Sequence, residues 1–293
     1  RTRTRTRTSS PSGPLPVVIW HGMGDSCCNE HSMGRVKHLI ETELGVDVYS
    51  VQLAEKEDED RDAGFFGNVN DQVAKVCEII ASDARLSKGY NAIGFSQGGQ
   101  FLRAVVEVCP TLEPSMPKCS KLITFGGQHQ GVMDWPGCGK DVSDLFCRSF
   151  EAMLGWGAYS DFLRQRVVQA QYFKDPLKME TYLKKNIFLP GINNEVHRNP
   201  QYKENLASLD LLLLYMWKGD TTVVPKESSL FGVYNATTKK VTPLKEQAFY
   251  REDWIGLREL DEQGKLLLDV IEGNHMEIDW DFFNSTIVHG FLS

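Results

Sequence analysis

The chain has 293 residues, of which 41% are hydrophobic and 24% charged, so it is long enough for one large globular domain with a sizeable core. Its formal net charge is -7, and removing the four arginines of the first eight residues leaves 28 basic against 39 acidic residues. An acidic body argues against a nucleic acid or an anionic membrane as partner. No run of 18 apolar residues occurs, so we expect no transmembrane helix and no stable membrane insertion.

The chain opens with a repetitive arm and continues as one domain. Residues 1–13 include RTRTRTRTSS and carry almost no core-forming side chains, so we expect a disordered arm followed by a domain over 14–293. These residues also lack the charged-then-apolar pattern of a leader, so we expect no signal peptide among them.

After the arm, strand patterns alternate with amphipathic helix patterns. Strands are predicted at 15–22, 46–53, 90–96, 121–127, 209–220 and 264–275, and helices at 32–44, 70–83, 98–108 and 280–292. This order predicts an α/β fold with a mostly parallel sheet and helices on both faces. The alternation stops at about residue 131 and resumes at about 206. We interpret 131–206 as an inserted, largely helical region over the carboxyl edge of the sheet, with a helix over 159–173.

The segment GFSQG places Ser96 between Gly94 and Gly98, after a strand pattern and before a helix pattern. A serine hydroxyl is a weak nucleophile until a base removes its proton, and it must project from the backbone to reach a substrate. A sharp strand-to-helix turn with small flanking residues achieves this, which is the nucleophile elbow of α/β-hydrolases. The alternative is a glycine-rich turn in which the serine caps a helix.

The elbow predicts that an acid and then a histidine follow the serine along the chain. Asp220 ends the predicted strand 209–220, and His275 ends the last one, 18 residues before the end. Both positions lie where the fold would bring them to Ser96, so these three residues are the predicted triad. Taken singly, either could be an ordinary loop residue.

Other histidines and aspartates compete for these roles. His21 and His129 also follow predicted strands, and for both we favour hydrogen bonds that fix a loop. Asp25 precedes the serine and would break the expected order, and Asp210 begins a strand and would lie at the wrong edge.

The tetrahedral intermediate of acyl transfer needs two backbone N–H donors. The residue after the nucleophile, Gln97, should supply one. The glycine-rich loop HGMGD after the first predicted strand should supply the other, with Met23 as the donor. The alternative for this loop is a plain tight turn.

Cysteines and glycosylation sequons indicate the compartment. The cysteines form no paired C-x-x-C pattern, so no metal site is expected, and no organic cofactor is implied. The sequons at Asn235 and Asn284, together with the many cysteines, favour an oxidising secretory-pathway compartment. The count is odd, so at least one thiol lacks an intramolecular partner. The seven are Cys27, Cys28, Cys77, Cys109, Cys119, Cys138 and Cys147.

The chain resembles the palmitoyl-protein thioesterases, in particular the lysosomal type 1 enzymes, over nearly its whole length after the arm. The resemblance is carried by VIWHGMGDSCC, VNDQVAKVC, GYNAIGFSQGGQFLRAV, FGGQHQGV, VVQAQYFKDP and EGNH. It implies an α/β-hydrolase that removes palmitate and similar acyl groups from S-acylated cysteines of proteins and peptides. It also implies a lysosomal or secreted protein, and we expect a monomer.

The resemblance extends to individual residues. It implies the same triad and oxyanion donors as the elbow does, and disulfides between Cys27 and Cys28, Cys77 and Cys109, and Cys138 and Cys147, which leaves Cys119 free. It also implies that the insertion walls an acyl groove. The apolar residues of the insertion assigned to that wall are Val167, Val168, Tyr172 and Phe173.

Two other functions fit the same residues. An ester hydrolase such as a lipase would use the same triad on an alkoxide leaving group. A catalytically silent acyl-binding protein would keep the groove, but the complete triad argues against it.

Overall fold

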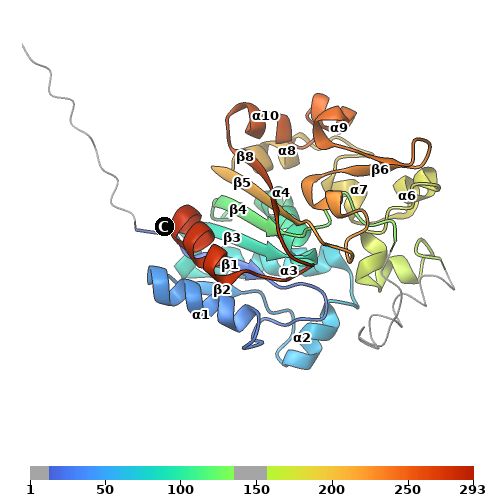
Figure 1. The fold of residues 1–293 in the computed structure, drawn as a ribbon. Coiled ribbons are helices and arrows are strands. Elements are labelled where there is room, and N and C mark those ends of the chain that lie inside the picture. The colour runs from blue at the N-terminus through green and yellow to red at the C-terminus, as the bar shows by residue number, and fades with distance from the viewer. Residues whose placement is uncertain (1–12, 135–156) are drawn as a thin grey trace, which may run out of the picture.

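The computed structural model describes residues 13–134 and 157–293. A six-stranded sheet with the order β2-β1-β3-β4-β5-β8 forms its centre, and each neighbouring pair is parallel (Figure 1). The strands are β1 (Val17–Trp20), β2 (Val48–Ser50), β3 (Tyr90–Phe95), β4 (Cys119–Phe125), β5 (Leu211–Trp217) and β8 (Leu266–Ile271). All six predicted strands are present, and the predicted fold class is confirmed.

The helices cover both faces of the sheet. Those before the insertion are α1 (Met33–Leu44), α2 (Glu57–Ala63), α3 (Val69–Ser82) and α4 (Gln97–Leu112). Those after residue 157 are α6 (Met179–Lys185), α7 (Leu189–Ile192), α8 (Pro200–Ala207), α9 (Ala248–Arg251), α10 (Leu257–Glu262), α11 (Trp280–Phe282) and a closing π-helix (Phe283–Leu292). The four helices predicted outside the insertion are all present.

Two apolar clusters join these helices to the sheet. One face packs against α1 and the closing helix, because Met33, Val36 and Ile40 recur at helical spacing and point at the strands. The other face packs against α3 and α4. Strand residues alternate between the clusters, as Ala92 and Ile93 do, because successive side chains of a strand point to opposite faces.

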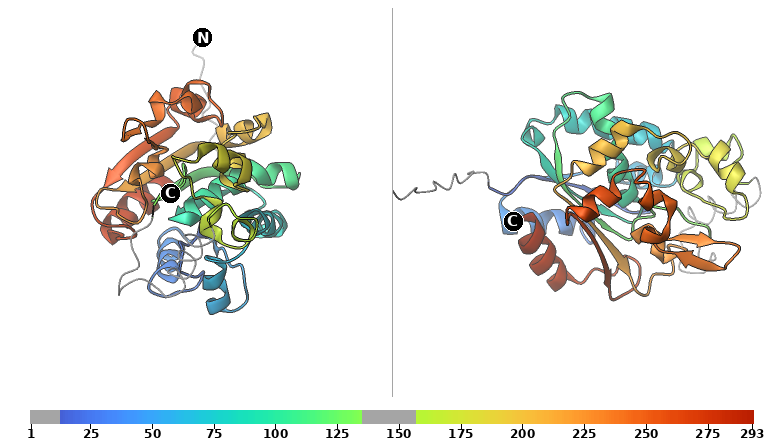
Figure 2. Two further views of the ribbon diagram at one scale, coloured as in Figure 1. Left: turned by 90° about the vertical axis from the view of Figure 1, so that its right-hand side faces the viewer. Right: turned by 90° about the horizontal axis from the view of Figure 1, so that it is seen from above.

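The described part of the insertion lies at the carboxyl ends of the strands, away from the C-terminus (Figures 1 and 2). The predicted helix over 159–173 is wrong. Its place is taken by two short 3-10 turns, Leu163–Gln165 and Val168–Gln171, with a bridge from Val167 to Phe66. Long-range contacts override the helical spacing here, since Gln169 and Gln171 donate to backbone carbonyls far away in the sequence.

Two further features complete the described chain. A two-stranded antiparallel hairpin, β6 (Val233–Asn235) with β7 (Lys240–Thr242), follows β5 and was not predicted. Among the described residues, no helix has both the length and the apolar character needed to cross a membrane. The predicted arm lies outside the described residues apart from Gly13.

Candidate active site

Ser96 occupies a strained turn between β3 and α4. Its backbone has φ 51° and ψ −125°, a region that non-glycine residues rarely adopt. The two flanking glycines make this turn feasible. A Cβ at Gly94 would lie 2.4 Å from Gly99 Cα, and a Cβ at Gly98 would lie 2.3 Å from the Trp20 carbonyl oxygen. The geometry is that of a nucleophile elbow.

The three predicted triad residues form one hydrogen-bonded chain. His275 Nε2 lies 2.9 Å from Ser96 Oγ, and His275 Nδ1 lies 2.7 Å from Asp220 Oδ2. The order of carboxylate, imidazole and hydroxyl lets the imidazole take the serine proton while the carboxylate fixes the ring. The Asp220 side chain is fully buried and that of His275 is 11% exposed, so the carboxylate is shielded from solvent and the imidazole is nearly so.

The carboxylate has a full set of partners. Besides His275, it accepts hydrogen bonds through Oδ1 from the backbone amides of Thr222 and Val223 at 2.8 and 3.0 Å. The indole of Trp217, at the end of β5, packs edge-on against the imidazole with 5.5 Å between ring centres. These contacts hold the His275 ring in one orientation before a substrate arrives.

The predicted oxyanion donors lie beside the nucleophile. Gln97 is the first residue of α4, so its N–H is one of the helix's unsatisfied donors. Met23 lies in the loop after β1. Neither backbone amide has a hydrogen-bond acceptor among the residues that the structure describes. Both are therefore available to a substrate oxygen.

A pocket of about 520 Å³ opens at Ser96. Its walls come from the loop after β1, from the start of α1 and from the segment after His275. Asp25 fixes one wall, because its Oδ1 accepts from the Ser26 amide and from the side chains of Asn29 and Ser32. The apolar part of the lining consists of Met23, Met33, Met276, Ile278 and Trp280.

A second side chain, besides that of His275, contacts the Ser96 hydroxyl. Gln128, which follows β4, donates from Nε2 to Ser96 Oγ at 3.0 Å, and its own Oε1 accepts from Gln100 Nε2 at 3.3 Å. Gln128 was not among the residues predicted from the sequence. The available signal was a glycine-rich segment, FGGQHQG, at the carboxyl end of a predicted strand, the edge where reactive groups gather.

The competing residues have structural roles. His21 is buried, with Nδ1 2.9 Å from the Gly22 carbonyl and Nε2 3.5 Å from Asp60. His129 is fully buried, with Nε2 2.9 Å from Thr124 Oγ1. Both agree with the loop-fixing role favoured from the sequence. Asp210 pairs with a lysine at the amino end of β5, away from Ser96.

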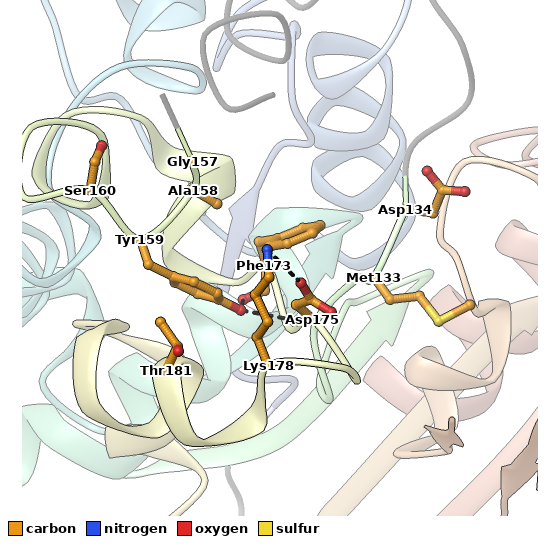
Figure 3. Close-up of a pocket in the computed structure, with 10 residues that line it drawn as sticks. All are labelled: Met133, Asp134, Gly157, Ala158, Tyr159, Ser160, Phe173, Asp175, Lys178 and Thr181. Carbon is orange, nitrogen blue, oxygen red and sulfur yellow. Dashed lines mark hydrogen bonds and ion pairs between the residues drawn. The ribbon is translucent and has the colours of Figure 1, made fainter. Parts of the chain in front are cut away.

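The four residues assigned to the acyl wall have different surroundings. Val167, Val168 and Tyr172 are at most 4% exposed and pack within the fold, so they present little surface to a ligand. Phe173 lines a pocket of about 430 Å³, together with Tyr159 and Met133 (Figure 3). The lining of this pocket and that of the pocket at Ser96 have no described residue in common.

Five of the seven cysteines lie among the described residues. Cys27 is bonded to the adjacent Cys28, and Cys77 to Cys109, while Cys119 is a buried free thiol. The proposed pair of Cys138 and Cys147 lies outside the described residues.

The two sequons lie in different settings. Asn235 is exposed at the β6–β7 turn, where its side-chain oxygen accepts from two backbone amides. Asn284 is half-buried in the closing helix.

Comparison with known proteins decides the family. The profile of the family described as palmitoyl protein thioesterase matches residues 16–275, which span the elbow, the acid and the histidine. The chain belongs to the palmitoyl protein thioesterase family.

Curated members of the palmitoyl protein thioesterase family match along most of the chain. Palmitoyl-protein thioesterase 1 of Caenorhabditis elegans is 46% identical over 90% of this chain and 87% of that protein. A palmitoyl-protein thioesterase-dolichyl pyrophosphate phosphatase fusion of Schizosaccharomyces pombe is 35% identical over 96% of this chain, and the match covers 44% of the fusion. Lysosomal thioesterase PPT2-B of Xenopus laevis is 26% identical over 88% of this chain and 85% of that protein.

Proposed function

We propose that this thioesterase hydrolyses the thioester between a long-chain fatty acyl group and a protein or peptide cysteine, with Ser96 as nucleophile, His275 as base and Asp220 as its orienting anion. The observation that most supports it is the chain of contacts from Asp220 through His275 to Ser96 Oγ, at 2.7 and 2.9 Å, on a strained elbow. The names of its relatives support palmitate as the acyl group.

In the first half-reaction, Ser96 Oγ bonds to the thioester carbonyl carbon and gives its proton to His275 Nε2. The carbonyl oxygen becomes an oxyanion, which the amides of Met23 and Gln97 stabilise. The carbon–sulfur bond then breaks, and the thiolate leaves and takes the proton from the imidazole. The products are a free cysteine and an acyl ester on the serine.

In the second half-reaction, water attacks the acyl carbon and gives a proton to His275. The carbon–Oγ bond then breaks, and the imidazole returns the proton to the serine oxygen. The fatty acid leaves and the enzyme is restored. This step expels a serine oxygen, which is a poorer leaving group than a cysteine thiolate with its pKa near 8.5.

The insertion contributes the far wall for the acyl chain in this proposal. Phe173 is the candidate contact, because it is the one of the four assigned residues that lines a described pocket, and the proposal requires the acyl chain to reach that pocket from the separate pocket at Ser96. We further propose a lysosomal or secreted, monomeric, glycosylated protein. The support for the compartment and for glycosylation comes from the name of the Xenopus laevis relative, the disulfides and the exposed sequon at Asn235.

The decisive test compares thioester with oxoester. An S-palmitoyl cysteine peptide and the matched O-palmitoyl serine peptide should be hydrolysed by the same preparation below their micelle-forming concentrations. The proposal expects a clear preference in kcat/KM for the thioester. Faster turnover of the oxoester would instead make the chain a generic esterase. No turnover of either, with no labelling of Ser96 by a fluorophosphonate, would leave an acyl-binding protein.

A further inference from the structure

Gln128 contacts the atom that forms and breaks the covalent bond. Its Nε2 lies 3.0 Å from Ser96 Oγ, and its side chain is 2% exposed. Within residues 13–134 and 157–293, Ser96 Oγ therefore has two side-chain partners, the imidazole and this amide. The triad mechanism uses the first and assigns nothing to the second.

The contact has one consistent direction. The hydroxyl has a single proton, and catalysis requires it to point at His275 Nε2. The serine oxygen must then accept from its other partner, and the amide nitrogen of Gln128 is the group that can donate. Gln100 secures this orientation, because its Nε2 donates to Gln128 Oε1.

The loop that carries Gln128 is fixed at several points. The imidazole of His129 is hydrogen-bonded to Thr124 on β4. The backbone carbonyl of His129 accepts from the Arg103 guanidinium at 3.3 Å and from Asn193 Nδ2 at 3.2 Å. Burial, reinforced by the Arg103 charge, holds the pKa of His129 well below its usual range, so the ring stays neutral. The amide of Gln128 is thus held rigidly in place before any substrate binds.

We propose that Gln128 is a catalytic residue that stabilises Ser96 Oγ as the leaving group of deacylation, an inference that rests on the proposed function. In the free enzyme the hydroxyl oxygen accepts the amide hydrogen bond. In the acyl-enzyme the same atom is an ester oxygen, which is a weak acceptor. As the carbon–Oγ bond breaks, negative charge returns to that atom and the hydrogen bond strengthens.

This change in strength acts mainly on one step. Relative to the acyl-enzyme, the transition state of deacylation gains the hydrogen bond, so Gln128 accelerates the release of the fatty acid. Relative to the free enzyme, the transition state of acylation gains little, because the bond already exists. Loss of the amide donor should therefore slow deacylation more than acylation.

Pre-steady-state kinetics with an S-palmitoyl cysteine peptide test this directly. Gln128→Met removes the donor and keeps the size of the side chain. We expect kcat to fall roughly 10- to 100-fold, the worth of a hydrogen bond to a charged group, with the rate of the first thiol release within a few-fold of wild type. Thiol release should then show a burst of one equivalent, and mass spectrometry of quenched enzyme should show the palmitoyl group on Ser96.

Two further variants separate catalysis from folding. Gln130→Met is the matched control, because Gln130 is a buried glutamine of the same loop whose Oε1 accepts from Lys174 rather than contacting Ser96. It should show no new burst. Gln128→Glu places a carboxyl group that donates only when protonated. Its activity relative to wild type should therefore be highest at acid pH and fall as the carboxyl ionises.

The outcomes also separate this inference from the proposed function. Gln128→Met with unchanged kcat, or with acylation and deacylation slowed equally, would overturn the role of the amide while leaving the wild-type thioesterase intact. A Gln128→Glu profile parallel to that of wild type would do the same, even if the methionine variant failed to fold. A wild-type protein that releases no thiol would remove both proposals.

Discussion

The carboxyl edge of the sheet and the described insertion are stabilised by different kinds of contact. At the edge, Ser96, Asp220 and His275 each follow a regular strand. The strands before Ser96 and Asp220 are buried almost throughout, whereas β8, before His275, is the outer strand and is largely exposed. In the insertion, helices are short, and buried amide side chains bond to the backbone of distant segments, as Gln171 does with the Gly67 carbonyl. The reactive groups thus lie on periodic elements, and the covering region is held by specific polar contacts.

The two regions meet at a buried ion pair on α4. Arg103 Nη1 lies 2.8 Å from Glu107 Oε1, and both side chains are fully buried. The same guanidinium donates to the Ile192 carbonyl and to Asn193 Oδ1 of the insertion, as well as to the loop after β4. Substitutions at the carboxyl edge should therefore affect the rate of catalysis. Substitutions at this ion pair should affect the stability of the contact between the two regions, and substitutions in the insertion should affect substrate preference.

The largest effect should come from Ser96→Ala. Without the nucleophile, thioester hydrolysis should fall on the order of 10⁴-fold or more, because the triad acts as a unit. The melting temperature should not fall, since the substitution removes one polar atom from a strained position. Activity within tenfold of wild type in a purified preparation would exclude Ser96 as the nucleophile.

Asp220→Asn comes next. An amide in place of the carboxylate disfavours the productive tautomer of His275, and we expect a loss in kcat of roughly 10³- to 10⁴-fold. Asp25→Asn, at a carboxylate that supports the wall of the same pocket, is the comparison for a general loss of charge there and should cost less. A silent Asp220→Asn would assign the acid to another residue.

The disulfide between Cys77 and Cys109 should stabilise the helices that pack on the sheet. It ties α3 to the end of α4 and closes a loop of 32 residues in sequence separation, so the chain-entropy relation predicts a contribution of about 3–4 kcal/mol to the free energy of unfolding. The double variant Cys77→Ser and Cys109→Ser should lose about that much in denaturant unfolding. Cys119→Ser, at the buried free thiol, is the control for loss of a buried sulfur and should cost less.

Glu107 should make the stability of the folded protein depend on pH. Burial raises the pKa of Glu107 from 4.5 to about 7, although the Arg103 charge lowers it. The folded protein then holds a proton that the unfolded chain releases above pH 4.5. The stability that this proton confers is complete below that pH and declines as the pH rises to about 7.

Glu107→Gln should remove this decline, measured as the difference in unfolding free energy between the variant and wild type across pH 4.5–7. Glu204→Gln, at an exposed glutamate of α8, is the matched control and should leave the profile as it is. An unfolding free energy that changes with pH by the same amount in wild type and in Glu107→Gln would contradict the assignment.

The smallest effect concerns the insertion. Phe173→Ala should reduce the preference for palmitoyl over shorter acyl chains by a few-fold, because each buried methylene contributes up to ~0.8 kcal/mol and an open groove realises only part of it. The measurement is kcat/KM over a series of S-acyl peptides. Phe162→Ala, at a 60% exposed phenylalanine of the same region, should not change the series. Equal effects of the two would remove Phe173 from the acyl wall.

The sequence predicted the periodic half of the molecule well because its signals are local. The apolar run of β5 and the spacing of Met33, Val36 and Ile40 identify a strand and a helix without knowledge of their neighbours. The elbow and the order of serine, acid and histidine likewise follow from short segments. These elements account for the sheet and for the three residues that meet at its edge.

The remaining features depend on contacts that no local pattern encodes. The segment over 159–173 has helical spacing, yet the side chain of Gln169 is drawn to the Gly64 carbonyl, 105 residues away. Gln128 likewise gains its role from a serine 32 residues earlier in the chain. The strands of the β6–β7 hairpin have three residues each, too few for a period to be recognised.

The central claim is that Ser96 carries the acyl group during turnover. The most direct measurement is mass spectrometry of the enzyme quenched during hydrolysis of an S-palmitoyl cysteine peptide, followed by peptide mapping. The account predicts a palmitoyl adduct on the peptide that contains Ser96, absent from Ser96→Ala and removed by water over time. Turnover with the adduct on any other residue, or with free thiol released and no covalent intermediate in wild type or in Gln128→Met, would contradict it.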